Sequence, residues 1–291
     1  MKKDNVLLIV GNGFDLNMDL KTSYSDFLDS LKTHSLTNDL IRELRIRKKT
    51  NWVDIEKELE NCAINGLREL NAVSLSSRYK LKHTEYKEIK IFLKSFLLEK
   101  QKKTIYNLDE KNSYNLLLGL CADVNNNITI LNFNYTDTID RLYDVILQNR
   151  FIDIEDRFKQ IHVHGDLTTG IVFGIDDKAK VKKEHVFLHK SFDNNTTKIN
   201  INALLEDQKE IIFFGYSLGI SDASYFEDFF KKICLPNNKT SKSSQLKLTF
   251  YYYKEEGYID LFNRLLDLTN HSTAKLRQYN NIKFIDSSIN L

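Results

Sequence analysis

A short apolar run near the N-terminus sets the strongest limit on the fold. Val6-Leu7-Leu8-Ile9-Val10 is uninterrupted and ends at Gly11-Asn12-Gly13. Continuous runs of Val, Leu and Ile are typical of a parallel strand that is covered on both faces. Paired glycines let the backbone turn sharply and bring its N–H groups close to an anion. The stretch therefore predicts a buried first strand that enters a nucleotide-binding turn.

The turn departs from the usual dinucleotide fingerprint, which has a third glycine where this chain has Leu16. A tight strand–helix corner without a ligand is therefore the alternative. Shortly after the turn, Ser23 stands three residues before Asp26, which is the pattern of a capped helix start.

Composition favours a globular, reduced protein. The 291 residues contain one proline and ten glycines, so no linker is evident and we expect a single domain over residues 1–291. The three cysteines form no C-x-x-C pair, which predicts neither a zinc site nor a disulfide framework. The apolar run is too short for a signal peptide or a membrane span, so we expect a cytoplasmic protein that does not contact membranes.

Charge is balanced over the whole chain, with 42 Lys and Arg against 40 Asp and Glu. A near-neutral protein has no general attraction for polyanions, so a nucleic-acid partner is not expected.

Residues 34–125 carry helical patterns and few strand signals, and they predict a helical insertion after the first strand. The segment Trp52-x-Asp54-x-Glu56 places acidic residues beside an apolar stripe. Either a functional segment or an ordinary solvated helix face with a buried Trp is compatible with this pattern.

Strand signals return at residues 128–133, and a helical pattern begins near Thr138. Asn134 falls at the carboxyl end of this second strand, where its amide can both donate and accept hydrogen bonds. An asparagine that only turns the chain is the alternative.

A third strand, residues 160–164, is expected to end at His164, which precedes Gly165. Alternation places His162 and His164 on the same face. Two histidines at this spacing can bind a metal, but no third ligand follows, so no metal is expected. His164 is a candidate acid or base because histidine exchanges protons near neutral pH; a structural histidine is the alternative.

The C-terminal part repeats the strand–helix pattern. Residues 170–175, 210–214, 246–252 and 282–285 are expected strands, and Gly215 and Ser217 form a second turn able to face a phosphate or ribose. Ser221 or Asp222 is expected to cap the following helix. His185 and His189 are interpreted as surface or cap residues. Strands alternating with helices predict an α/β fold with a doubly wound, mostly parallel sheet.

The order of these corners resembles the Rossmann-like fold shared by sirtuins and bacterial NAD-consuming defence proteins. The segments Ile9–Leu16, Thr22-Ser23-Tyr24, Trp52-x-Asp54-x-Glu56, Asn132–Thr136 and His164-Gly165 resemble more closely the bacteriophage abortive infection AbiH family. This resemblance extends from about residue 5 to about residue 270.

The resemblance to sirtuins implies roles for individual residues. Asn134 would orient the ribose and the attacking water, and His164 would be the general base. Gly11 and Gly13 would approach the diphosphate of NAD, and Gly215 and Ser217 the adenosine. The remaining expected NAD-binding residues are Asn12, Phe14, Asp15, Tyr24, Gly165 and Asp222.

The chain also departs from sirtuins. Asp15 stands near a position where sirtuins have serine, Thr136 replaces an expected Asp, and no zinc module is present, which disfavours deacylation of lysine.

Three functions remain open. The first is an NAD hydrolase of phage defence, the second a module that binds NAD or ADP-ribose without hydrolysis, and the third a toxin that modifies nucleic acid or protein. Relatives with this fold often assemble, so a homo-oligomer is expected. A phage-derived trigger is also expected, because a hydrolase of this kind would be dormant until infection.

Overall fold

The computed structural model describes residues 3–34, 37–47, 55–68, 78–102, 108–150, 155–196, 198–236 and 245–289. The chain divides into two compact units. Unit 1 comprises Met1–Leu20, Thr104–Val163 and Thr197–Leu291, and unit 2 comprises Lys21–Lys103 and His164–Thr196.

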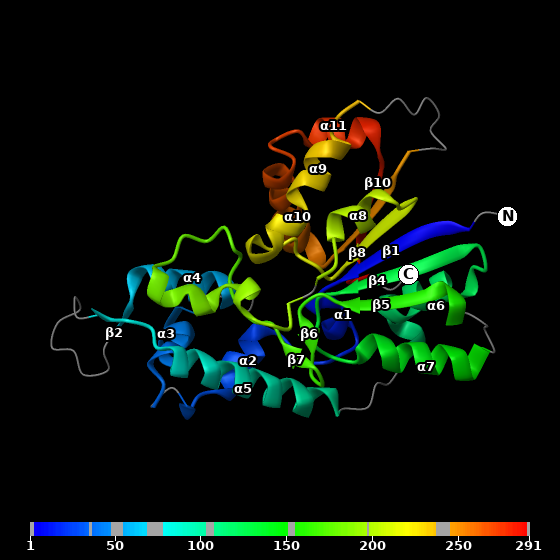
Figure 1. Ribbon diagram of the computed structural model, residues 1–291. Coiled ribbons are helices and arrows are strands. Elements are labelled where there is room, and N and C mark those ends of the chain that lie inside the picture. The colour runs from blue at the N-terminus through cyan, green and yellow to red at the C-terminus, as the bar shows by residue number, and fades with distance from the viewer. Residues whose placement is uncertain are drawn as a thin grey trace. The chain divides into compact units, whose positions relative to one another are not determined.

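Unit 1 is built on a parallel sheet of six strands in the order β10-β9-β8-β1-β4-β5 (Figure 1). The strands are β1 (Asp4–Val10), β4 (Asn126–Asn132), β5 (Phe158–His162), β8 (Glu210–Phe214), β9 (Lys247–Tyr252) and β10 (Asn281–Asp286). The chain adds β4 and β5 on one side of β1 and then returns to add β8, β9 and β10 on the other. This is the strand order of Rossmann-type folds, whose ligands bind at the carboxyl ends where the order reverses.

Helices cover both faces of this sheet, which confirms the predicted α/β, doubly wound architecture (Figure 1). One face is covered by α1 (Asn12–Asn17), α6 (Asn112–Ala122) and α7 (Thr138–Arg150). The other is covered by α8 (Ile201–Glu206), α9 (Glu227–Ile233), α10 (Lys254–Leu268) and α11 (Thr273–Tyr279). Short 3₁₀ turns occur at η2 (Leu108–Glu110), η3 (Glu155–Arg157) and η6 (Ile220–Tyr225).

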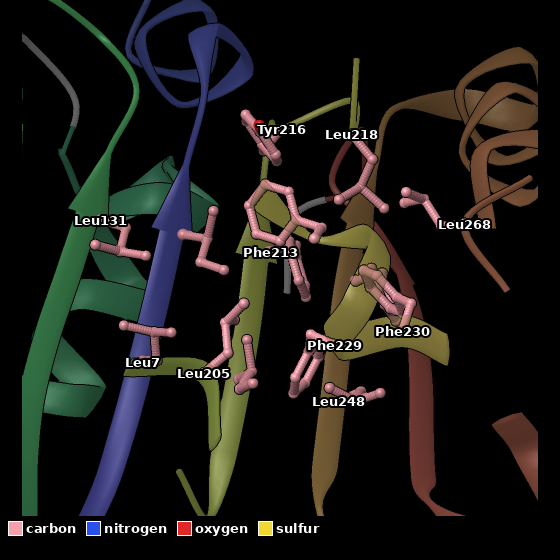
Figure 2. Close-up of a cluster of buried hydrophobic side chains, with 14 of the residues drawn as sticks. Leu7, Leu131, Leu205, Phe213, Tyr216, Leu218, Phe229, Phe230, Leu248 and Leu268 are labelled. Atoms are coloured by element: carbon pink, nitrogen blue, oxygen red, sulfur yellow. The ribbon is translucent and has the colours of Figure 1, made fainter. Parts of the chain in front are cut away.

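Strand β1 contributes to the core on both of its faces. Leu7 and Ile9 pack with the side chains of α8–α11, whereas Leu8 and Val10 pack with those of α1, α6 and α7. Figure 2 shows the first cluster, in which Leu7 lies on β1 and Phe229 and Phe230 project from α9. Each fully buried aliphatic side chain contributes about 1.5–3 kcal/mol, which explains why the run has no polar interruption.

Strand β5 ends two residues earlier than predicted. It stops at His162, and Val172 N–H donates to the carbonyl of His164 at 2.7 Å. The chain thus turns there into a two-stranded hairpin of β6 (Gly165–Asp166) and β7 (Gly170–Ile171). The strand expected over residues 170–175 is accordingly reduced to the short β7.

The predicted helix cap at Ser221 or Asp222 is wrong. Both residues lie within η6, and the residue that precedes α9 is Phe226. Asp222 is instead buried and accepts a hydrogen bond from the Tyr216 hydroxyl at 3.2 Å.

Among the described residues, unit 2 contains four helices that precede β4: α2 (Tyr24–Ser30), α3 (Asp39–Arg47), α4 (Ile55–Asn65) and α5 (His83–Gln101). It also contains the short antiparallel pair of β2 (Leu67–Arg68) and β3 (Arg78–Tyr79). Two 3₁₀ turns that follow β7, η4 (Lys183–Leu188) and η5 (Lys190–Phe192), belong to the same unit. The predicted cap of α2 is confirmed, because Ser23 Oγ accepts from Asp26 N–H at 3.0 Å. Of the block 34–125, residues 34–103 belong to unit 2 and the rest to unit 1.

None of the helices in the described ranges combines the length and the apolar character that crossing a bilayer requires.

Glu56 makes a buried ion pair within unit 2. Its carboxylate lies 2.9 Å from Lys190 Nζ, and both side chains are less than a tenth exposed. The Gly174 N–H also donates to Glu56, at 3.4 Å. This pair joins α4 to the segment that follows β7, and it gives Glu56 a structural role. Trp52 and Asp54 of the same motif lie outside the described residues.

The prediction that His185 is a surface or cap residue is wrong, because it lies within η4 and only 2% of it is exposed. Its ring packs edge-on against Phe187, and burial lowers the pKa of the imidazole from its ordinary value. His189 does occupy a cap position, at the start of η5.

Replacing Glu56 by Gln is expected to destabilise the protein by about 3–5 kcal/mol, because Lys190 then keeps a buried charge without its carboxylate. Guanidinium unfolding measures the change. The double variant Glu56→Gln, Lys190→Met should recover part of the loss.

The exposed pair of Lys232 and Glu206, at 2.7 Å, is the matched control. Glu206→Gln should cost less than about 1 kcal/mol, since water screens exposed pairs. Equal losses in Glu56→Gln and Glu206→Gln would contradict the structural role of the buried pair.

Candidate functional site

The turn after β1 consists of Gly11 and the first residues of α1, and in unit 1 it is in direct backbone contact with the turn after β8, which begins at Gly215. Gly13 N–H donates to the Gly215 carbonyl at 2.9 Å, and Gly11 N–H donates to the Phe214 carbonyl at 3.2 Å. A Cβ on Gly13 would lie 2.5 Å from Gly215 Cα, and Gly215 itself has φ of +60°. These positions require glycine because any side chain would separate the two turns.

This contact gives the glycines a packing role that does not depend on a ligand. The N–H groups of Gly11 and Gly13 are already used inside the protein. Binding of a diphosphate by these two residues therefore stays a prediction, and it has to involve other groups of the turns.

Asn134 lies at the carboxyl end of β4 and reaches across to the turn after β1. Its Nδ2 donates to the Gly11 carbonyl at 3.0 Å. Its backbone N–H donates to Oδ1 of Asn132 at 2.9 Å, which turns the chain as β4 ends. The structure therefore brings together three groups of predicted site residues: the turn at Gly11–Gly13, Asn134, and the turn at Gly215.

Asp15 belongs to the same region and contacts residues 133–137, which connect β4 to α7 and are called the Asn134 loop below. The Thr136 hydroxyl donates to Asp15 Oδ2 at 2.6 Å, and Thr138 Oγ1 donates to Thr136 Oγ1 at 3.2 Å. Asp15 is only 1% exposed, and its Oδ1 accepts no hydrogen bond from a described residue.

Burial raises the pKa of Asp15 to about 6, although interactions with the Thr136 and Thr138 hydroxyls lower it. Near neutral pH a buried carboxylate therefore exchanges its proton readily. Shifted carboxyl groups of this kind gather at functional sites, since burying a charge without a cationic partner costs stability.

His162 contacts the Asn134 loop from β5. Its Nδ1 lies 3.1 Å from the Asn134 carbonyl, and its Nε2 lies 2.9 Å from Gln160 Nε2. Gln160 in turn donates to both carboxylate oxygens of Asp140, at 3.2 and 3.0 Å.

His164, Gly165 and Tyr24 belong to unit 2. His164 is 5% exposed, and Gly165 has φ of +72°, where a Cβ would lie 2.0 Å from the Gly170 carbonyl oxygen. The Tyr24 ring lies 6.3 Å from that of Phe173. Val163 and His164 are consecutive, and the chain passes there from unit 1 to unit 2. Convergence of His164 with the unit 1 residues stays a prediction.

The other predicted binding residues differ in accessibility. Ser217 is exposed and Asn12 is partly exposed. Phe14 is fully buried and packs edge-on against Phe214, with ring centroids 5.5 Å apart. Its side chain therefore belongs to the core beneath the turn after β1 and stabilises that turn by packing. Asp222 is buried and accepts the hydrogen bond of the Tyr216 hydroxyl described above.

The side chains that support Asn134 were not among the residues predicted from the sequence. The alternation that places Gln160 and His162 on one face of β5 is visible in the sequence, but nothing there shows that this face meets Asn134. Among the described residues no three His, Cys, Asp or Glu side chains are grouped as metal ligands.

Asp15→Asn is expected to remove a pH-dependent cost from folding. The ordinary Asp pKa is about 3.9, so the wild type loses about 3 kcal/mol of stability relative to the variant as the pH rises from about 4 to above 6. The sign follows from the raised pKa: the folded state binds the proton more tightly, and deprotonation at higher pH therefore opposes folding. Urea unfolding of both proteins between pH 4 and 8 measures the difference.

Thr136→Val removes a hydrogen bond that favours the carboxylate, so the midpoint of this pH dependence should move to higher pH. A stability difference between wild type and Asp15→Asn that is constant over this range would contradict the assignment.

The comparisons with known proteins agree with the resemblance noted in the sequence. A family model described as "Bacteriophage abortive infection AbiH" matches residues 7–243. No curated protein matches the chain. Because the match covers most of the chain and includes the turn after β1, the Asn134 loop and the turn after β8, the protein belongs to the bacteriophage abortive infection AbiH family.

Proposed function

We propose that this protein is an NAD⁺ hydrolase that depletes NAD when a phage infects the cell. Membership of the AbiH family implies a role in phage abortive infection. Hydrolysis of NAD is the finer step, and it rests on the resemblance to sirtuin-like proteins together with the arrangement of the residues in unit 1.

The observation that carries the proposal is the hydrogen bond from Asn134 to the Gly11 carbonyl, at 3.0 Å. It joins the ends of β1 and β4 beside the position where the strand order reverses. Rossmann-type sheets bind dinucleotides at this position. An asparagine is held there with its backbone and its amide nitrogen both fixed, as a group that positions a ribose should be.

The reaction requires little covalent chemistry from the protein. The bond between ribose C1′ and the nicotinamide nitrogen breaks, and nicotinamide leaves with the bonding electron pair. A water oxygen bonds to C1′, and the water loses one proton, so the products are nicotinamide, ADP-ribose and H⁺. Positive charge develops on the ribose in the transition state, and a nearby carboxylate or carbonyl dipole stabilises it.

Residues of the chain are proposed to divide this work. Asn134 orients the ribose and the attacking water, and His164 accepts the proton of the water, as the resemblance implies. Asp15 accepts a hydrogen bond from Thr136 of the Asn134 loop and supplies a buried negative charge near neutral pH. Such a charge would stabilise the positive charge that develops on the ribose.

Asn134→Ala or His164→Ala is expected to lower NAD hydrolysis by about 10²-fold or more, since a positioned base alone contributes about 10²–10⁴-fold. The measurement follows NAD and nicotinamide in phage-infected cells that carry each variant, together with phage plating efficiency. Melting temperatures of the purified variants verify folding.

Asn127→Ala is the matched control for Asn134→Ala. Asn127 lies near the amino-terminal end of β4, whereas Asn134 follows the carboxyl end of the same strand. It should retain NAD depletion and phage resistance. Unchanged NAD in infected cells that are protected by the wild-type protein would contradict the proposal. Calorimetric binding of NAD without turnover would instead favour the function as a nucleotide-binding sensor.

A further inference from the structure

We infer that His162 is a positioning residue for Asn134, and that it acts through the last link of a hydrogen-bond chain running from Asp140 through Gln160. The inference rests on the proposed function, in which Asn134 orients the substrate. It adds a residue from β5 that neither the family resemblance nor the candidate site residues include.

The contacts determine which ring nitrogen of His162 carries hydrogen. A carbonyl oxygen only accepts hydrogen bonds, so Nδ1, which lies 3.1 Å from the Asn134 carbonyl, must be the donor. In the neutral ring Nε2 then holds the lone pair, and it lies 2.9 Å from Gln160 Nε2, which can donate to it.

The orientation of Gln160 is determined by Asp140. Both carboxylate oxygens of Asp140 lie within 3.2 Å of Gln160 Nε2, and a carboxylate requires a donor there. The two amide hydrogens of Gln160 are thus directed at Asp140 and at His162. Gln160 therefore donates in both directions, and His162 in turn donates from Nδ1–H to the Asn134 carbonyl.

Asn134 is consequently held from two sides in unit 1. His162 fixes its carbonyl, and the Gly11 carbonyl accepts from its side-chain amide at 3.0 Å. The Asn134 carbonyl can turn away only if its bond to His162 breaks, and such a turn would shift the side chain that contacts Gly11. A small rotation matters, because misplacement of a catalytic group by about 1 Å can cost about 10²-fold in rate.

Two substitutions of His162 separate positioning from general structural support. In His162→Asn the side-chain amide nitrogen can occupy the place of Nδ1, so the donor to Asn134 is retained. In His162→Gln the amide nitrogen falls near the place of Nε2, and the donor is lost. Both variants replace the ring by an uncharged amide, so they are matched in polarity.

The expected result is that His162→Gln lowers kcat for NAD about 10- to 100-fold with little change in KM, whereas His162→Asn stays within a few-fold of wild type. Hydrogen exchange gives a readout that needs no NAD turnover: amides of residues 133–137 should exchange faster in His162→Gln and at the wild-type rate in His162→Asn.

The outcomes distinguish this inference from the proposed function. A wild-type protein that protects against phage but never hydrolyses NAD overturns the proposed function, and phage plating with hydrogen exchange then decides the role of His162. Wild-type exchange and wild-type protection in His162→Gln would overturn the inference. Equal losses in both variants would also overturn it, since the donor at Nδ1 would then be irrelevant.

Gln160→Met tests the rest of the chain. Loss of its donor leaves the His162 ring less well oriented, so faster exchange of residues 133–137 is expected, by less than in His162→Gln. Exchange at the wild-type rate would remove Gln160 and Asp140 from the positioning role.

Discussion

The contact between the turns after β1 and β8 is the constraint on which the arrangement of unit 1 depends. Gly13 and Gly215 approach so closely that neither tolerates a Cβ, and the Gly13 N–H is bonded to the facing carbonyl. This contact fixes the backbone of Gly11, whose carbonyl receives the Asn134 side chain. The ends of the three central strands therefore form one rigid edge, and catalytic groups that must be held within a fraction of an ångström benefit from such rigidity.

Asp15 shows that this edge is not optimised for stability alone. A carboxyl group with a pKa of about 6 is largely ionised at neutral pH although it is buried, and among the described residues only hydroxyl groups support the Asp15 side chain. An apolar residue would avoid that cost. Proteins commonly retain such unfavourable groups where activity needs them, so the energetic penalty at Asp15 and the proposed role of the Asn134 loop support each other.

Periodicity predicted most of the fold. The buried run of β1 and the strand–helix alternation were sufficient to predict a parallel sheet, because short continuous apolar runs in an α/β protein are typical of strands buried on both faces. The end of β5 and the start of α9 were misplaced, since a hairpin bond from Val172 and the intervening turn η6 depend on tertiary contacts. Gly11, Asn134 and Gly215 follow neighbouring strands, and the structure brings them together. The supporting contacts of Thr136 and His162 depend on the tertiary fold, which no local pattern reveals.

A crystal structure of the full chain with ADP-ribose tests the central claim most directly. The diphosphate is expected to lie against the turns after β1 and β8, and the ribose that carries nicotinamide in NAD is expected within hydrogen-bond distance of both Asn134 and His164. ADP-ribose bound elsewhere, or a His164 ring directed away from the ribose C1′ carbon, would contradict that claim.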